Sequence, residues 1–91
     1  MNPPHVLDEN SSSFCIVMNL LGIHEKDIGI RINEGRREVA VLAKKEAQNS
    51  KRGYFWIFGV PSEGLLDSIT TRYKGGVFEI VIPKSRMRSV A

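Results

Sequence analysis

The stretch that most constrains the fold is residues 73–84, where a glycine pair precedes an apolar run that ends at a proline. Gly75-Gly76 predicts a tight turn, because glycine adopts positive φ without the strain of a β-branched residue. Residues 77–82 are rich in Val and Ile, which favour an extended backbone. Pro83 has no N–H to offer a neighbouring strand and should end the run. We predict a central β-strand at residues 77–82, covered on both sides.

Other segments alternate apolar and polar residues with a period of two, which is typical of strands with one buried face. The clearest case is residues 54–60, where Tyr54, Trp56 and Phe58 share one face. Turn residues recur roughly every 8–12 positions, as in all-β sandwiches. The pattern predicts an all-β, immunoglobulin-like antiparallel β-sandwich of two sheets with three or four strands each. Besides 77–82, strands are expected at residues 5–7, 14–20, 28–33, 39–43, 54–60 and 68–73.

The predicted sandwich domain spans residues 14–84. Residues 1–13 are expected to be a flexible N-terminal segment, and residues 85–91 a short basic tail without periodicity. Within the domain, residues 33–36 predict a hairpin turn in which Gly35 takes positive φ. Residues 44–53 are polar and are expected to form a ten-residue loop.

Length and composition indicate one ordinary globular domain. The chain has 91 residues, of which 42% are hydrophobic and 25% charged, and its net charge is +3. The single Cys15 excludes an internal disulfide and fits a reducing compartment. No stretch approaches the ~20 apolar residues of a membrane span, and the first residues lack the features of a signal peptide. We therefore expect a cytoplasmic protein that has no membrane partner.

Several fragments, taken in order, resemble motifs of the small heat-shock proteins and their α-crystallin domain. Residues 76–84, Gly-Val-Phe-Glu-Ile-Val-Ile-Pro-Lys, are similar to the family's terminal "nGvLxIxIPK". Residues 20–28 are similar to its "lPGvxkedI", and Ile69, Thr71 and Tyr73 to its "IxAxY". The resemblance extends from residue 14 to residue 84. It implies the α-crystallin β-sandwich and an ATP-independent, stress-response chaperone that holds partly unfolded client proteins without a cofactor.

The sequence departs from the family at positions that bear on assembly. Trp56 stands where the family places an Arg that makes ionic contacts at or near the dimer interface, and its large apolar area suits a hydrophobic contact instead. Segment 44–53 is shorter than the excursion that bacterial, archaeal and plant members exchange between subunits. No Ile-x-Ile pair follows Pro83. We therefore expect neither a strand-exchanged dimer nor a large cage, but a monomer or a homodimer through an edge formed by Tyr54, Trp56 and Phe58.

By the same resemblance, a client segment binds at two strand edges and the apolar groove between them. The edges would be the strands expected at residues 28–33 and 68–73, whose backbone groups an extended peptide can pair. The same side chains also suit a role in the core alone, and both interpretations stay open. The groove residues would be Ile28, Ile30, Ile32, Ile69 and Thr71.

The sequence contains no constellation typical of an enzyme. Cys15 suits a buried apolar position better than a nucleophile, and two distant histidines give no metal set. Lys51-Arg52 before the aromatic run would suit a single-stranded nucleic-acid-binding β-domain, although these aromatics suit a core or an interface better. The related CS-type domain, a co-chaperone adaptor, is the other alternative to a small heat-shock chaperone.

Overall fold

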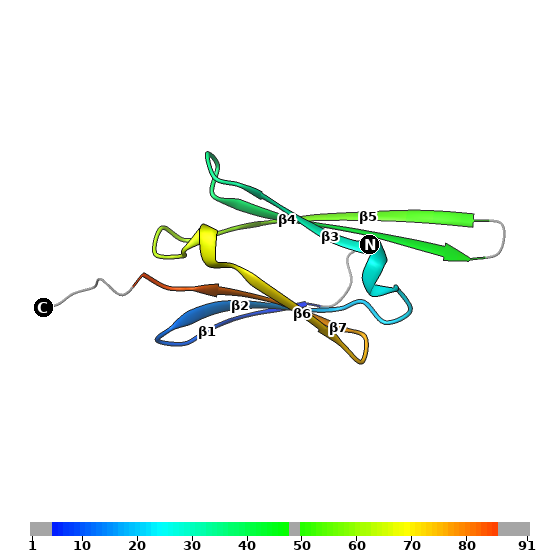
Figure 1. The fold of residues 1–91 in the computed structure, drawn as a ribbon, viewed down its shortest axis with the longest axis horizontal. Coiled ribbons are helices and arrows are strands. Elements are labelled where there is room, and N and C mark those ends of the chain that lie inside the picture. Colours follow the sequence, from blue (N-terminus) through cyan, green and yellow to red (C-terminus); the bar gives the residue numbers. More distant parts are fainter. Residues whose placement is uncertain (1–4, 48–49, 86–91) are drawn as a thin grey trace, which may run out of the picture.

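The computed structural model describes residues 5–47 and 50–85, and these form two antiparallel sheets packed face to face (Figure 1). The four-stranded sheet has the order β1-β2-β7-β6, and the three-stranded sheet the order β3-β4-β5. The predicted all-β sandwich is therefore confirmed. Two 3₁₀ turns, η1 (Glu25–Asp27) and η2 (Leu66–Ser68), lie in the connections. The strands are β1 (His5–Glu9), β2 (Ser13–Asn19), β3 (Ile28–Asn33), β4 (Glu38–Ala47), β5 (Ser50–Gly59), β6 (Thr70–Lys74) and β7 (Val77–Pro83).

The strand predicted from residues 77–82 is β7, and it lies between β2 and β6. Both glycines of the preceding turn have positive φ, 60° at Gly75 and 83° at Gly76, as the sequence predicted. The expected cover on both sides is wrong, however. Val77 is 41% exposed, because no layer packs over the outer face of this sheet in the described part of the chain.

The edge strand expected at residues 5–7 is present and extends to Glu9 as β1. It pairs with β2 from His5 opposite Met18 to Glu9 opposite Phe14. The hairpin turn is closed by Asn10, whose side-chain oxygen accepts bonds from the backbone N–H groups of Ser12 and Ser13 at 2.7 and 2.8 Å. This part of the predicted flexible segment is thus held in the sheet. Residues 1–4 of that segment and residues 86–91 of the predicted tail lie outside the described residues.

The loop predicted at residues 44–53 is wrong. β4 and β5 continue their ladder from Lys44 opposite Gly53 to Ala47 opposite Ser50, so the hairpin extends beyond the sandwich (Figure 1). The side chains of Lys44, Lys45 and Arg52 are exposed, which is where polar residues are stable. A ribbon with water on both faces needs no apolar alternation, so the periodicity that marks a half-buried strand is absent here.

The hairpin turn after β3 also differs from the prediction, because the residue with positive φ is Arg37 (54°) and not Gly35. Long-range hydrogen bonds hold Arg37 in this less favourable conformation. Its guanidinium donates to the carbonyl oxygens of Pro61 at 2.7 Å and Gly64 at 2.6 Å. Its own carbonyl accepts from the Val60 N–H at 2.9 Å. Arg37 thereby ties the β3–β4 turn to the segment that follows β5.

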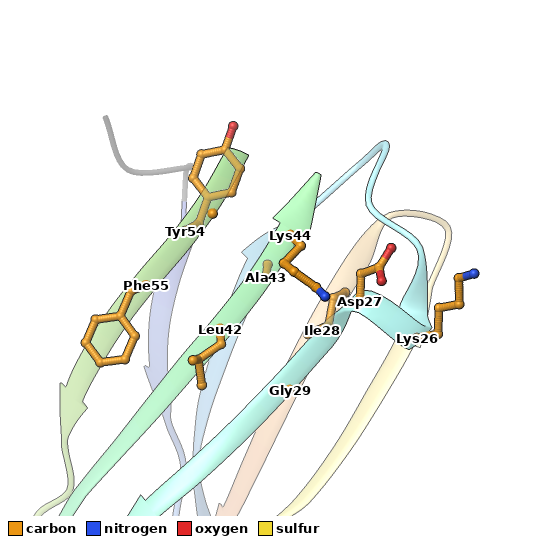
Figure 2. A pocket seen from close by; sticks show the side chains of 10 residues that line it. Lys26, Asp27, Ile28, Gly29, Leu42, Ala43, Lys44, Tyr54 and Phe55 are labelled. Atoms are coloured by element: carbon orange, nitrogen blue, oxygen red, sulfur yellow. The ribbon is translucent and has the colours of Figure 1, made fainter. Parts of the chain in front are cut away.

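The three-stranded sheet presents an inner face to the core and an outer face to solvent. Leu42 and Phe55 are direct cross-strand neighbours on the outer face, beside Gly29 of β3 (Figure 2). Phe55 is 58% exposed and Ile57, the next outward residue of β5, is 52% exposed. This outer face is therefore unusually apolar for a solvated surface.

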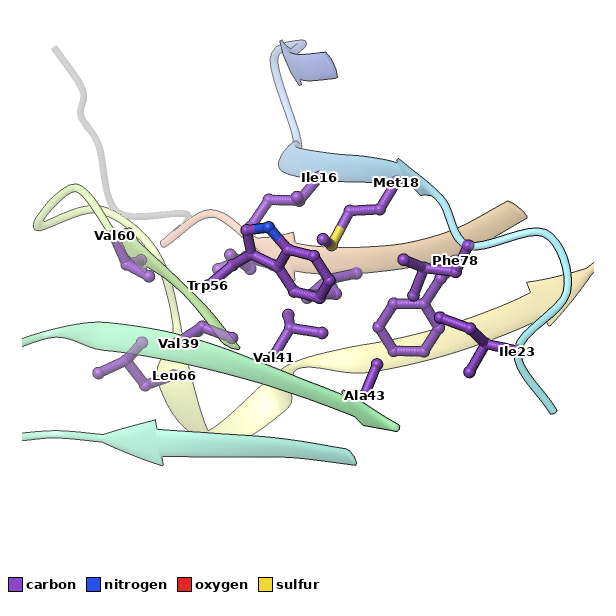
Figure 3. Packing of buried hydrophobic residues seen from close by; sticks show 13 residues of the cluster. Ile16, Met18, Ile23, Val39, Val41, Ala43, Trp56, Val60, Leu66 and Phe78 are labelled. Atoms are coloured by element: carbon purple, nitrogen blue, oxygen red, sulfur yellow. The ribbon is translucent and has the colours of Figure 1, made fainter. Parts of the chain in front are cut away.

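The core lies between the two inner faces and is made of side chains from both sheets (Figure 3). The deepest residues come from β2, β4 and β7, the strands with a neighbour on each side. Their alternation buries every second residue, including in β7, for which the sequence had predicted cover on both sides. The most deeply buried large side chains are Met18, Val39, Val41, Ile80 and Ile82.

Replacing Gly76 with alanine should destabilise the fold more than the same change at Gly75. A Cβ on Gly76 would lie 2.6 Å from Leu21 Cδ1 and 3.1 Å from its Cα, whereas one on Gly75 meets nothing within 4 Å. Positive φ costs alanine ~1–2 kcal/mol at either position, and overpacking adds ~1–3 kcal/mol at Gly76 alone. Urea unfolding followed by the fluorescence of Trp56 would measure both. Equal losses would show that Leu21 moves aside freely.

Candidate functional site

The sandwich has two open sides, each bounded by one edge strand from each sheet. β1 and β5 share one side, because residues of both strands line a common hollow. The other two edge strands, β3 and β6, therefore bound the opposite side. These are the two edges that the sequence analysis proposed for client binding, and the structure leaves both without a strand partner on their outer side in the described part of the chain.

On β3, the inward side chains are those of Ile28, Ile30 and Ile32. Ile28 and Ile30 pack against the core yet stay half-buried, and Ile32 is 40% exposed. Their cross-strand neighbours on β4, by contrast, are fully buried: Val39 and Val41 have no exposed surface. The drop in burial from β4 to β3 arises because β3 has a neighbour on one side only. The three isoleucines thus border both the core and the solvent.

On the facing edge, Ile69 and Thr71 differ in burial. Ile69 packs against the core and is half-buried, while Thr71 is exposed and lies opposite the buried Ile80. Tyr73, named above only as part of a motif and not as a groove residue, continues this inward row and packs on Phe78 with ring centroids 6.4 Å apart. Its hydroxyl donates to the Leu20 or Ile23 carbonyl oxygen, at 3.1 and 2.5 Å. The spacing of two from Thr71 was the signal that could have found it.

The structure corrects the role expected of Trp56. Its indole lies inside the core (Figure 3) and is 7% exposed. It stacks on Tyr54 with ring centroids 5.6 Å apart and planes 5° apart. The side chain is therefore unavailable to centre an apolar dimer contact. Its position opposite Val41, on the inner face, is the reason. β5 itself is an edge strand, so a dimer edge through the backbone of Tyr54, Trp56 and Phe58 stays a prediction.

A hollow of about 420 Å³ lies between β1 and β5 and was not anticipated from the sequence. Its lining is largely apolar and includes Leu7, which is 63% exposed, together with Phe58 and Ile82. Near it, Lys84 pairs with Glu9 at 2.7 Å, and its ammonium lies 4.9 Å from the centroid of the Phe14 ring. The alternation in β1 was too short for Leu7 to stand out.

The aromatic run does not form a stacking surface for nucleic-acid bases. Tyr54 and Trp56 face inward and stack on each other, while Phe55 faces outward. A base therefore has at most one aromatic ring of this run to stack on from outside. Within residues 5–47 and 50–85, no cluster of His, Cys, Asp or Glu could hold a metal ion, and no helix is long and apolar enough to cross a membrane.

No protein-family model matches the sequence, and no curated protein matches it either. Solved structures do resemble the fold. A small heat-shock protein from Xylella fastidiosa superposes with a TM-score of 0.86 at 19% identity, over 100% of this chain and 93% of its own. The hspA of Xanthomonas axonopodis gives 0.80 at 20% identity, over 92% and 94%. The rat alpha crystallin domain gives 0.69 at 12% identity, over 94% of each chain.

These likenesses confirm the resemblance inferred from the motifs at the level of the fold. The chain has the α-crystallin β-sandwich that small heat-shock proteins share. β3 and β6 are the strands that the resemblance proposed as client edges, and their role in binding stays a prediction.

Cys15 lies on the outer face of the four-stranded sheet, opposite Asp8 on β1 and Val81 on β7. It is a free thiol and is half-buried. Burial raises the pKa of this thiol above its usual value, and the negative charges of Glu79 and Asp8 raise the pKa further. All three causes disfavour the thiolate, which is the nucleophilic form. The structure therefore gives Cys15 no activation as a nucleophile, but it places the thiol on the outer face and only half-buried, not in the buried apolar position that the sequence suggested.

The rate at which iodoacetamide alkylates native Cys15 should rise with pH later than it does for a free cysteine. Since a negative charge beside the thiol disfavours the thiolate, Glu79→Gln should lower the pKa of Cys15 and move the rate profile toward lower pH. Glu63→Gln is a matched control, because Glu63 is exposed and is no cause of the raised pKa. A profile that Glu79→Gln leaves in place would contradict the electrostatic part of this account.

Proposed function

We propose that this chain is an ATP-independent chaperone domain of the small heat-shock type, which holds partly unfolded proteins and is not an enzyme. The observation that carries the proposal is the pair of unpartnered edges, β3 and β6, on one side of the sandwich. The half-buried inward side chains are those of Ile28 and Ile30 on β3, of Ile69 just before β6 and of Tyr73 on β6. The likeness to small heat-shock proteins supports the proposal through the fold.

The physical basis of holding is strand addition combined with side-chain burial. An extended client segment can pair with the free N–H and C=O groups of an edge strand, as peptides do when they extend a sheet. Its alternate side chains would then cover Ile28, Ile30 and Ile32 on β3, or Ile69 and Thr71 beside β6. Unfolded chains carry both free backbone groups and exposed apolar residues, so this mode selects for them without a defined sequence.

The holding of clients in this way requires neither nucleotide nor metal. Binding by strand addition is reversible and is driven by hydrogen bonds and apolar contact alone. We therefore propose that no cofactor takes part, and that the protein acts in the cytoplasm, where Cys15 stays reduced.

For assembly, we propose a monomer or a modest homodimer through the β5 edge. Residues 44–47 are already paired with residues 50–53 in their own hairpin, so a strand exchanged with a neighbour would first have to leave this ladder. That cost argues against the exchanged dimer. Since the Trp56 indole is buried, the edge contact would consist of backbone hydrogen bonds and the outward side chains of β5.

Suppression of client aggregation should be measurable without ATP and should depend on the inner face of β6. We expect Thr71→Lys to raise the protein concentration needed for half-suppression about threefold to tenfold, because an unpaired ammonium in an apolar contact costs ~1 kcal/mol or more. Thr70→Lys is the matched control, since Thr70 is also exposed but faces outward from the same strand. Light scattering of a heated or reduced test protein would measure both.

Two outcomes would count against the proposal in different ways. Absence of suppression by the unchanged protein at large excess over the client would remove the chaperone function. Equal effects of the two lysine variants would keep the function but show that the client does not bind through the inner face of β6.

A further inference from the structure

The outer face of the three-stranded sheet carries a self-complementary pattern. Along β4 the outward residues are Glu38, Ala40, Leu42 and Lys44, an acidic, a small, a large and a basic side chain in turn. Beside them on β5, the outward residues Ile57 and Phe55 lie opposite Ala40 and Leu42. One end of the face is therefore complementary to the other in charge and in side-chain size.

Two hollows on this face differ in charge. The first, of about 470 Å³, includes Lys26, Asp27 and Lys44 in its lining, a net charge of +1 (Figure 2). The second, of about 630 Å³, includes Arg31, Glu34 and Glu38, a net charge of −1. Leu42 and Phe55 line both hollows and therefore stand at the boundary between them. Within residues 5–47 and 50–85, neither Glu38 nor Lys44 takes part in an ion pair.

We propose that this outer face binds a second copy of the chain, face to face. The two-fold axis would run across the strands and parallel to the sheet. It would pass between two rows of outward cross-strand neighbours: Gly29, Leu42 and Phe55 in one row, and Arg31, Ala40 and Ile57 in the other. Such an isologous contact places each residue of one row against the other row of the second copy. Lys44 then faces the second copy's Glu38, and the positive hollow faces the negative one.

The same axis matches side-chain size. Phe55 faces the second copy's Ile57, and Leu42 faces its Ala40, so large and small side chains interdigitate. Arg31 faces Gly29, at which an added Cβ would meet nothing within 4 Å. Aligned sheets cross at ~30°. Lys44 lies about 10 Å from the axis, so this crossing angle moves the second copy's Glu38 sideways by about 5 Å. The flexible Lys44 side chain can span that displacement.

The alternative axis along β4 is disfavoured by charge. It would place Lys44 against Lys44 of the second copy and Glu38 against Glu38 of the second copy, which creates two like-charge contacts. The antiparallel arrangement is therefore the one that the pattern specifies, and its charges provide the test.

The footprint sets the expected strength. A patch of three strands, each about seven residues long, measures about 24 Å by about 14 Å. Its area of roughly 350 Å² per copy is below the ~800 Å² per partner of a standard interface. The dimer should therefore be weak and depend on concentration. Sedimentation equilibrium of the full chain from about 10 µM to about 1 mM would cover the range of such an interface.

The decisive experiment is a charge-exchange cycle. Each of Glu38→Lys and Lys44→Glu converts two attractive contacts per dimer into repulsive ones, so each should weaken dimerisation about tenfold or more. The double variant restores opposite charges and should return to within about threefold of the unchanged protein. Both losses should shrink at high salt. Glu63→Lys and Lys74→Glu are controls that change the net charge equally at exposed positions off this face.

An apolar pair of variants separates this face from the β1–β5 side. Phe55→Ser should weaken the dimer, whereas Leu7→Ser, at a similarly exposed residue of the other hollow, should not. Circular dichroism would confirm that each variant folds. A chain that stays monomeric throughout the range, a dimer indifferent to the charge cycle, or a dimer lost only with Leu7→Ser would each overturn the proposal.

Discussion

The structure depends on one hydrophobic core layer, which forms where the inner faces of the two sheets pack together. A three-stranded and a four-stranded sheet can enclose fully only the strands that have neighbours on both sides, which here are β2, β4 and β7. Met18, Val41 and Ile80 on these strands have no exposed surface. The edge strands share the same layer but cover it incompletely, so their inward side chains are mostly half-buried or exposed, and Trp56 of β5 is a buried exception. Stability and the availability of the edges therefore have a single origin.

Much of this architecture could be predicted from the sequence, because alternation with a period of two reports a half-buried strand directly. The prediction failed at residues 44–53 because a ribbon solvated on both faces has no such alternation. It failed at Gly35 because tertiary hydrogen bonds to Pro61 and Gly64 hold Arg37 in the positive-φ conformation instead. Local patterns carry no information on bonds made more than twenty residues away.

The candidate site was predictable in part, and for a similar reason. The alternation of apolar and polar residues identified the face of its strand on which each of Ile28, Trp56 and Thr71 lies. It could not distinguish a face that packs in the core from one that contacts a partner protein. Trp56 illustrates the difference: its face was correctly predicted, and pairing with β4 decides that this face is the core. Finding Leu7 needed knowledge of which strands lie side by side, whereas the spacing of Tyr73 from Thr71 was already visible in the sequence. The order of strands in the sheets, which the sequence does not display, thus determines what the site contains.

A face-to-face contact and the sheet edges use different groups and so do not compete. Edge pairing engages N–H and C=O groups that point within the plane of the sheet, whereas the face contact engages side chains perpendicular to it. Because the axis runs across the strands, it places each strand over the equivalent strand of the second copy, and β3 therefore faces β3. The two β3 strands would then lie about 10 Å apart, a gap that three or four extended residues can cross. One client segment could therefore engage both copies, and its second attachment would be intramolecular, which strengthens weak holding without any additional contact.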